Sequence, residues 1–369
     1  MAASLALGLL SAATLGLSCR TALVRASCAP PFRTLSLSAA AMTAVEPPTS
    51  AAAERLCLID GHGLAYRMHF ALQSSGMTTA AGQPTHALHG FCLKLLDLHE
   101  RFPGSRMIVA FDRPEQTLRE AMYPQYKAER PKMPMPLRPQ LAAMIEACVL
   151  LGATPLSSAG YEADDVIAAC VHHAEGTRHF DSIVVVSADK DLLQLVSPDG
   201  EGGKGDEGGV GGVGSVDGAP RVGVWDDKNK AMLDAAAVVA KHGVAPSQMA
   251  DYLALMGDKS DNVPGVPGVG AKSAAALLGQ YGSLNAVLEA AKTTMKPSKR
   301  RAALVDNEDL VRQSRELVGL RTDVPIDLSV VLGQPISVDG AELQDFLRRW
   351  ELARVAKKVD QLRRRAPGV

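Results

Sequence analysis

The amino-acid sequence predicts an α/β fold in which helices flank a central, mostly parallel sheet. Short apolar runs recur at residues 56–60, 107–112 and 183–189, and such runs are typical of buried parallel strands. Amphipathic stretches with helical spacing separate these runs, as in chains that alternate strands with helices. The 369 residues are 47% hydrophobic, which is enough for a sizeable core.

The segment that precedes the first strand differs in composition from the rest of the chain. Residues 1–45 contain no Asp or Glu and carry scattered arginines among Ala, Ser, Thr and Leu, which is typical of an organellar transit peptide. An apolar stretch at residues 5–17 resembles the h-region of a signal peptide and is too short for a membrane span. We therefore expect an unfolded presequence over residues 1–53 that directs the chain to an organelle. The two-part arrangement favours a plastid over a mitochondrion, and a tail without a targeting role is the alternative.

Residues 54–240 are predicted to form the α/β core. Besides the three apolar runs, residues 221–225 resume an extended pattern and supply a fourth strand. Helical spacing of apolar residues predicts helices over 140–151 and 163–174. Residues 197–219 are almost all Gly, Ser, Asp, Glu and Val, so we expect a flexible insertion between two neighbouring strands.

Residues 241–369 are predicted to be mostly helical, with turns at Gly and Pro. Helices are expected over 248–256 and 271–278, and residues 341–365 form a further amphipathic segment rich in Arg and Lys. The net charge of −1 gives no global signal for nucleic acid, but local patches matter more than totals. None of the six cysteines forms a C-x-x-C pair, so we expect small buried hydrophobes in a reducing compartment.

Acidic residues gather where the predicted strands end. The carboxyl ends of parallel strands share one edge of a sheet, where ligands bind in α/β folds. A single acid there is most often a helix cap or a turn residue, but caps and turns require neither Glu-x-Asp-Asp nor Asp-Lys-Asp. Such a cluster would repel itself unless cations neutralised it, and a centre of two Mg²⁺ ions for phosphodiester hydrolysis explains all of its members. The candidate metal-binding acids are Asp60, Asp112, Glu162, Asp164, Asp165, Asp189, Asp191, Asp258 and Asp261.

A basic segment, residues 113–138, lies between the second and third acidic motifs. Its cations, which include Arg119, Lys127 and Arg130, are suited to gripping phosphates, and Tyr126 is suited to stacking on an unpaired base. A Lys or Arg beside the scissile phosphate would also stabilise the charge that develops in the transition state. An ordinary solvated loop and helix is the alternative.

A Gly-rich turn joins the two helices expected at 248–256 and 271–278. Its glycines would let the backbone approach a ligand, and the second helix would offer its N-terminal N–H groups to a phosphate. This helix–hairpin–helix arrangement suits a duplex backbone that is held without reading its sequence. A Gly-rich turn between helices is a common and weak signal, but its position directly after Asp258 and Asp261 makes it a much more specific one. Its candidate DNA-binding residues are Gly265, Gly268, Gly270 and Lys272.

Taken in their order along the chain, these motifs resemble those of the 5′-3′ exonuclease domain of bacterial DNA polymerase I and its relatives, the flap endonucleases. The resemblance covers about residues 54–360. It implies a PIN-like 5′-nuclease fold, with a helical arch over residues 113–138 and a C-terminal helix–hairpin–helix region. The matching stretches are Leu58-Ile-Asp-Gly-His62 with Ala65-Tyr-Arg67, Phe111-Asp112, Tyr126-Lys-Ala-Glu-Arg130, Gly160-Tyr-Glu-Ala-Asp-Asp-Val166, Ser187-Ala-Asp-Lys-Asp-Leu192, Gly257-Asp-Lys-Ser-Asp-Asn-Val-Pro-Gly265 and Arg321-Thr-Asp-Val-Pro325.

The resemblance also implies how the candidate residues divide their roles. It assigns Lys127 and Arg130 as catalytic residues that engage the scissile phosphate, and it places Asp165 close to the acidic cluster. Mg²⁺ is the implied metal, with Mn²⁺ as a possible substitute, and K⁺ is implied where the hairpin holds duplex DNA. One metal would lie around Asp60, Asp112, Glu162 and Asp164, and the second around Asp189, Asp191, Asp258 and Asp261.

We therefore expect a Mg²⁺-dependent 5′-3′ exonuclease and 5′-flap endonuclease in the replication or repair of organellar DNA. Its expected substrates are 5′ flaps, nicked duplexes and RNA primers on DNA. It is expected to be a monomer that does not bind a membrane and that works together with a separate organellar DNA polymerase. A catalytically inactive DNA-structure-binding protein is one alternative, although it would be expected to have lost some of the acids. A PIN-like ribonuclease is the other, and it predicts fewer acids and no hairpin.

Overall fold

The computed structural model describes residues 54–198, 219–333 and 340–365. One sheet has the strand order β3-β2-β1-β4-β5-β6, and all neighbouring strands are parallel except β5 and β6. The mostly parallel sheet is therefore confirmed. Two strands, β3 and β6, escaped prediction because they are too short for an apolar periodicity. The strands are β1 (Arg55–Asp60), β2 (Arg106–Ala110), β3 (Ala153–Leu156), β4 (Ser182–Val186), β5 (Arg221–Asp226) and β6 (Ala231–Leu233).

The order of the strands reverses beside β1. From β1 the chain builds outward through β2 to β3, and it then returns to the other side of β1 to form β4. Ligands bind outside the carboxyl ends of the strands at such a switch point. Asp60 ends β1 and Asp189 lies just beyond β4, so these two acids face the switch point from both sides.

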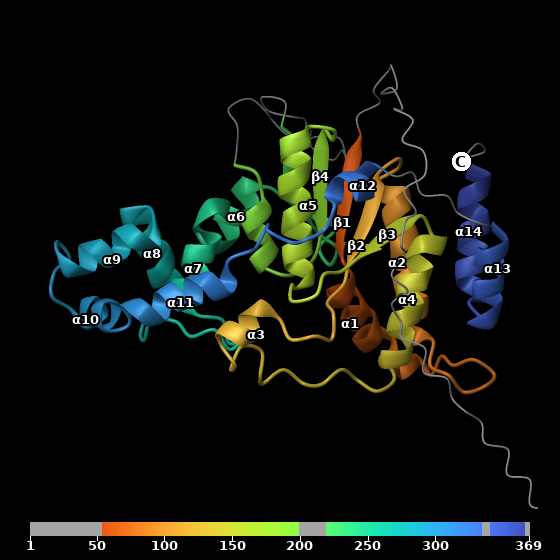
Figure 1. Cartoon of the computed structure of the whole chain (residues 1–369), viewed down its shortest axis with the longest axis horizontal. Coiled ribbons are helices and arrows are strands. Elements are labelled where there is room, and N and C mark those ends of the chain that lie inside the picture. The colour runs from red at the N-terminus through yellow and green to blue at the C-terminus, as the bar shows by residue number, and fades with distance from the viewer. Residues whose placement is uncertain (1–53, 199–218, 334–339, 366–369) are drawn as a thin grey trace, which may run out of the picture. The chain divides into compact units, whose positions relative to one another are not determined.

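Each face of the sheet carries its own apolar core. Successive strand residues point to opposite faces, so Leu56 and Leu58 pack with α5 while Cys57 and Ile59 pack with α1, α2 and α4. Figure 1 shows α5 on one side of the strands and α2 and α4 on the other. The predicted helices over 140–151 and 163–174 correspond to α4 and α5. These helices are α1 (Gly61–Leu72), α2 (His86–Arg101), α4 (Arg138–Leu150) and α5 (Ala163–Thr177).

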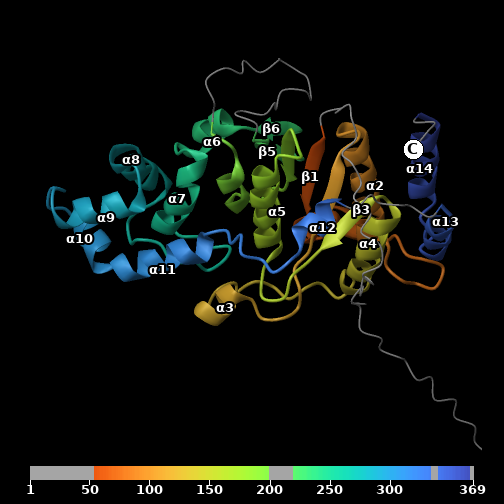
Figure 2. The ribbon, with the colours of Figure 1, turned by 45° about the horizontal axis from the view of Figure 1, so that its top comes forward.

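The chain beyond β6 is helical, as predicted. Apolar residues of α7, α8, α9 and α11 continue the same core that α5 forms on its face of the sheet, and Figure 2 shows α7 nearer to α5 than α8 and α9 are. The predicted helices over 248–256 and 271–278 correspond to α7 and α8. The helices of this region are α6 (Ala235–His242), α7 (Met249–Met256), α8 (Ala271–Tyr281), α9 (Leu284–Lys292), α10 (Lys299–Asp306), α11 (Glu308–Val318) and α12 (Leu328–Gly333).

The amphipathic segment predicted over 341–365 is two helices rather than one. These helices are α13 (Gly340–Arg349) and α14 (Ala353–Arg365), and between them Glu351 has a positive φ of 52°, which an α-helix does not accommodate. Phe346 and Val355 are buried in the core on the α2 and α4 face. The pair of helices therefore covers α2 and α4 (Figure 1).

The basic segment, residues 113–138, is helical only over α3 (Leu118–Met122) and at its last residue, Arg138, where α4 begins. A capping box between Thr117 and Glu120 starts this helix. Pro124 follows its end, and three further prolines between 131 and 136 prevent helix formation by removing N–H donors. The expected helical arch is thus one short helix, followed mostly by turns and irregular chain.

Two predictions concern residues outside the described ranges. The presequence over 1–53 and almost all of the Gly-rich insertion, residues 199–218, lie there. Within 54–198, 219–333 and 340–365, no helix has both the length and the apolar character needed to cross a membrane. In the same part of the chain all four cysteines, Cys57, Cys92, Cys148 and Cys170, are buried free thiols, as predicted.

Candidate metal and nucleic-acid site

The acids at the strand ends are held by the starts of helices. The Oδ1 of Asp60 accepts a hydrogen bond of 2.8 Å from the backbone N–H of Gly63 and so caps α1. Its Oδ2 accepts one of 3.1 Å from the hydroxyl of Ser187, which follows β4. Asp112 accepts a hydrogen bond of 2.8 Å from the backbone N–H of Ala163, the first residue of α5. The helix caps and the candidate metal ligands are therefore the same side chains.

A cavity of about 540 Å³ opens at this edge of the sheet. It is lined by five of the predicted metal-binding acids: Asp60, Asp112, Glu162, Asp164 and Asp189. The resemblance assigns Asp189 to the second metal, and in the structure its side chain lines the cavity together with the acids expected at the first. It also lies beside the second group, because its Oδ1 accepts a hydrogen bond of 3.0 Å from the backbone N–H of Asp191.

The electrostatics of this cavity favour a bound cation. Burial raises the pKa of Asp60 and of Asp164, and the neighbouring carboxylates of Asp112 and Asp189 raise both further. Each additional negative charge is therefore costly here. Hard divalent cations prefer carboxylate oxygens, so the donor set fits Mg²⁺ or Mn²⁺.

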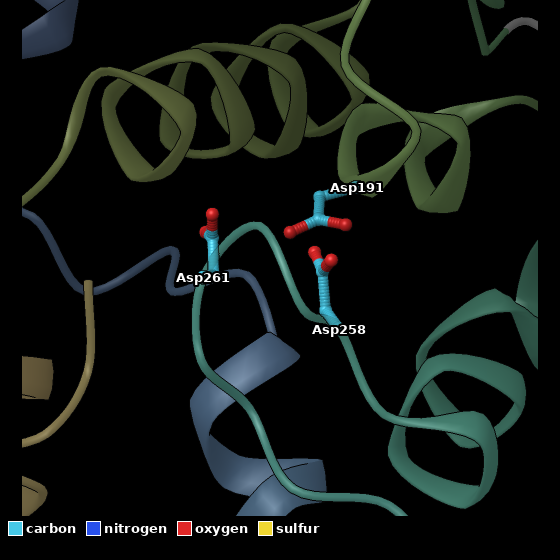
Figure 3. A group of neighbouring side chains, drawn as sticks. All are labelled: Asp191, Asp258 and Asp261. Atoms are coloured by element: carbon cyan, nitrogen blue, oxygen red, sulfur yellow. The ribbon is translucent and has the colours of Figure 1, made fainter. Parts of the chain in front are cut away.

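The second group of acids forms a compact cluster. Carboxylate oxygens of Asp191, Asp258 and Asp261 lie within 4.8 Å of one another, and Figure 3 shows the three side chains converging on one space. The Oδ1 of Asp191 is buried and has no hydrogen-bond partner. Burial, and then the surrounding carboxylates, raise the pKa of Asp191 to about 8. A divalent cation would satisfy this buried oxygen and neutralise the cluster, so these residues also fit a metal.

Lys127 and Arg130 connect the two groups of acids. The Nζ of Lys127 lies 2.6 Å from Oε1 of Glu162 and 3.6 Å from Oδ2 of Asp261, and Arg130 pairs with Asp261. Burial alone would lower the pKa of Lys127, but the carboxylates of Glu162 and Asp261 outweigh it and raise the pKa. Lys127 is therefore a cation at neutral pH. Because both cations line the cavity, the predicted catalytic residues lie beside the candidate metal ligands.

Arg119 and Asp165 have a different role from the predicted one. The guanidinium of Arg119 is buried and binds both oxygens of Asp165, at 2.6 and 2.7 Å. It also donates to Glu162 at 3.1 Å and to the carbonyls of Leu317 and Gly319 at 2.7 Å. The expected DNA contact of Arg119 and the expected metal role of Asp165 are thus replaced by one buried ion pair. This pair fastens the basic segment to α5 and to the end of α11.

The expected base-stacking role of Tyr126 is contradicted by its burial. Its side chain belongs to the core, and the residue is only 4% exposed. Its hydroxyl lies 3.0 Å from Oε2 of Glu162 and 3.3 Å from Oδ2 of Asp261. Sequence reasoning gave no role to other rings that do line the cavity, those of His62, Tyr66 and Phe70. Their spacing of four residues on one helix was the available signal.

The Gly-rich turn combines one tightly packed glycine with two exposed ones. A Cβ on Gly265 would lie 2.4 Å from the backbone of Met256, so this glycine lets the turn pack on the end of α7 rather than on a ligand. Gly268, Gly270 and Lys272 are exposed, and Gly270 precedes the first turn of α8. These three stay candidates for DNA binding, and K⁺ at the hairpin stays a prediction.

Comparisons with known proteins find matches for both parts of the chain. A family model described as the 5′-3′ exonuclease N-terminal resolvase-like domain matches residues 55–242, and one described as the 5′-3′ exonuclease C-terminal SAM fold matches residues 244–337. The 5′-3′ exonuclease of Aquifex aeolicus is 35% identical over 311 residues, which are 84% of this chain and 97% of that protein. DNA polymerase I of Rhizobium leguminosarum is 36% identical over 83% of this chain, and the chain spans 28% of its length.

Solved structures with low sequence identity have the same fold. The T5 D15 protein co-crystallised with metal ions superposes with a TM-score of 0.56 at 20% identity, over 82% of this chain and 99% of that one. The catalytic core of Rad2 in complex with DNA substrate gives a TM-score of 0.53 at 16% identity, over 84% of this chain and 92% of that one. The predicted class, a mostly parallel α/β sheet followed by a helical region, is therefore confirmed.

Proposed function

The chain belongs to the 5′-3′ exonuclease family, and from this premise we propose that it hydrolyses DNA as a Mg²⁺-dependent 5′-3′ exonuclease and 5′-flap endonuclease. One observation carries the proposal. Five carboxylates in one cavity and three in the adjoining cluster meet the cations Lys127 and Arg130. Acids of this number and burial suit two metal ions, and the cations beside them suit a phosphate.

The residues of the chain have separable tasks in this reaction. Bound Mg²⁺ would supply an activated water and stabilise the departing oxygen. The helix caps hold Asp60 and Asp112 in place, so the ligands are oriented before any metal binds. Lys127 and Arg130 lie where they can bind the scissile phosphate and stabilise the charge that develops on it.

The proposed substrates are 5′ flaps, nicked duplexes and RNA primers on DNA. The exposed turn at Gly268 and the N-terminus of α8 support a contact with the duplex backbone. One structural neighbour is the T5 D15 flap endonuclease in a pseudo-enzyme-product complex with DNA and metal ions. Several relatives are DNA polymerase I, so we propose a DNA polymerase as the functional partner.

Cleavage of a labelled 5′-flap duplex tests this function. We expect the purified full-length chain to release a labelled product in Mg²⁺ and none in EDTA, and Mn²⁺ to restore activity. Lys127→Ala should lower kcat roughly 10²- to 10³-fold, as expected when one preorganised charge-stabilising group is lost. Lys228→Ala, an exposed lysine in the turn after β5, is the matched control and should leave kcat unchanged. Cleavage that persists in EDTA would rule out a metal-dependent nuclease.

We also propose that the protein acts in an organelle, with a plastid favoured over a mitochondrion. The acid-free, arginine-bearing composition of residues 1–45 supports this proposal. A fusion of residues 1–53 to a fluorescent protein should accumulate in plastids. Accumulation in mitochondria would correct the choice of organelle, and a diffuse cytosolic signal would refute targeting altogether.

A further inference from the structure

One face of α1 carries three rings that run along the wall of the cavity. His62, Tyr66 and Phe70 are spaced by four residues, so they lie on the same side of the helix. Their ring centroids are 6.3 Å apart between His62 and Tyr66, and 6.4 Å apart between Tyr66 and Phe70. The backbone N–H of Asp112 donates to His62 at 3.0 Å, so the row begins at the acids.

Phe70 is the exposed member of this row. The residue is 57% exposed, whereas most large apolar side chains in the described structure are buried. A single exposed phenylalanine is ordinary on a protein surface. This one, however, lines a cavity that five carboxylates and the cations Lys127, Arg130 and Lys132 also line. Its ring contacts buried His69 edge-on, with centroids 5.1 Å apart, and His69 is hydrogen-bonded to His86 at 2.9 Å.

Cations line the same cavity as this ring. Arg130 and Lys132 both contribute to its wall, and Lys132 is exposed. An aromatic ring beside cations is the combination that proteins use to bind single-stranded nucleic acid, since the cations hold phosphates and the ring stacks on a base. Tyr126 is not available for this task, because it is buried.

We propose that Phe70 stacks on an unpaired base of the substrate strand and so makes the cavity selective for ends that carry an unpaired nucleotide. This inference rests on the proposed nuclease function. A base within a duplex already has both faces stacked on its neighbours, whereas an unpaired base offers a free face to Phe70. The ring is therefore a specificity residue, which acts through substrate binding.

Two flap substrates that differ only in their bases test the proposal. One carries normal nucleotides at the unpaired positions next to the junction, and the other carries abasic nucleotides with the same phosphates. We expect the full-length chain in Mg²⁺ to cleave the first with a kcat/KM roughly 5- to 100-fold higher, the range of one base–aromatic stack. Phe70→Leu and Phe70→Ala should remove this preference, and Phe70→Trp should preserve it.

The controls separate stacking from folding and from catalysis. Phe70→Leu keeps an apolar side chain, so an unchanged melting temperature shows that its effect is not structural. Val239→Ala removes a comparably exposed apolar side chain on α6 and should keep the preference. A preference that survives in Phe70→Leu overturns the proposal but leaves the nuclease function intact. If the wild-type chain cleaves neither substrate, the nuclease function fails.

Stacking can then be tested separately by measuring the affinity for each DNA by fluorescence anisotropy in Ca²⁺. Equal affinities for the two DNAs overturn the stacking proposal. Tighter binding of the DNA with normal bases, if Phe70→Leu abolishes it, supports the proposal.

Discussion

Asp164→Asn should lower kcat for flap cleavage by at least about 10³-fold, because a bound metal contributes several kcal/mol to the transition state and each 1.4 kcal/mol is tenfold. Asp164 lines the cavity beside Asp60 and Asp189, and Asn keeps its size while it removes the negative charge that a metal requires. The measurement is single-turnover cleavage of the labelled flap in saturating Mg²⁺. Binding of the flap DNA should be weakened much less than cleavage, since the proposed phosphate-binding residues Lys127 and Arg130 are unchanged.

The same substitution should stabilise the protein when no metal is present. The pKa of Asp164 is raised in the folded state, first by burial and then by Asp189 and Asp60, so its ionisation at neutral pH opposes folding. Asn cannot ionise and therefore relieves this opposition. We expect a higher melting temperature than wild type in EDTA and a smaller increase on adding Mg²⁺.

Glu175→Gln provides the control for Asp164→Asn. Glu175 lies near the other end of the same helix, α5, away from the cavity. Its replacement should leave both the cleavage rate and the effect of Mg²⁺ on melting unchanged. Wild-type cleavage in Asp164→Asn would remove this residue from the metal site.

Arg119→Met should have the largest effect on stability, lowering the free energy of unfolding by about 3–5 kcal/mol. The substitution keeps most of the buried chain length but leaves the carboxylate of Asp165, which is 1% exposed, without its cation. It also removes the donors to the carbonyls of Leu317 and Gly319. Urea unfolding followed by circular dichroism measures the loss.

A double variant shows how much of this loss comes from the unpaired charge. Arg119→Met combined with Asp165→Asn removes both charges, so it should be more stable than Arg119→Met alone. Arg138→Met, an exposed arginine at the end of the same basic segment, should change the free energy of unfolding by less than about 0.5 kcal/mol. If Arg119→Met is as stable as Arg138→Met, the buried ion pair does not fasten the segment.

The clustering of the acids is predictable from the sequence, because parallel strands all end at the same edge of a sheet. Apolar runs identify β1, β2 and β4, and the parallel sheet brings Asp60, Asp112 and Asp189 to one edge. The assignment of Asp189 to one metal was less predictable. It depends on the path of the chain after β4, where η2 (Asp191–Leu195) turns Asp191 toward Asp258 and Asp261.

The roles within the basic segment were not predictable from residue types. Arg119 and Arg130 are the same amino acid in the same segment, but one is 5% exposed and the other is exposed at the cavity. Because prolines break the helical periodicity, the sequence has no pattern that tells inward from outward side chains there. Gly265 illustrates the same limit, since its packing on Met256 involves a contact between backbones that no local pattern records.

The cations that contact the acids have a thermodynamic consequence. Lys127 pairs with Glu162, and Lys190 lies 2.9 Å from Asp258, so the protein carries its own counterions at the site. A metal ion that bound these carboxylates would free the lysines to bind the phosphates of a strand. Each ligand would then raise the affinity of the site for the other, and thermodynamic linkage requires that the two affinities rise by the same factor. Bound metal would thus strengthen the binding of the polyanion, and bound polyanion would strengthen the binding of the metal.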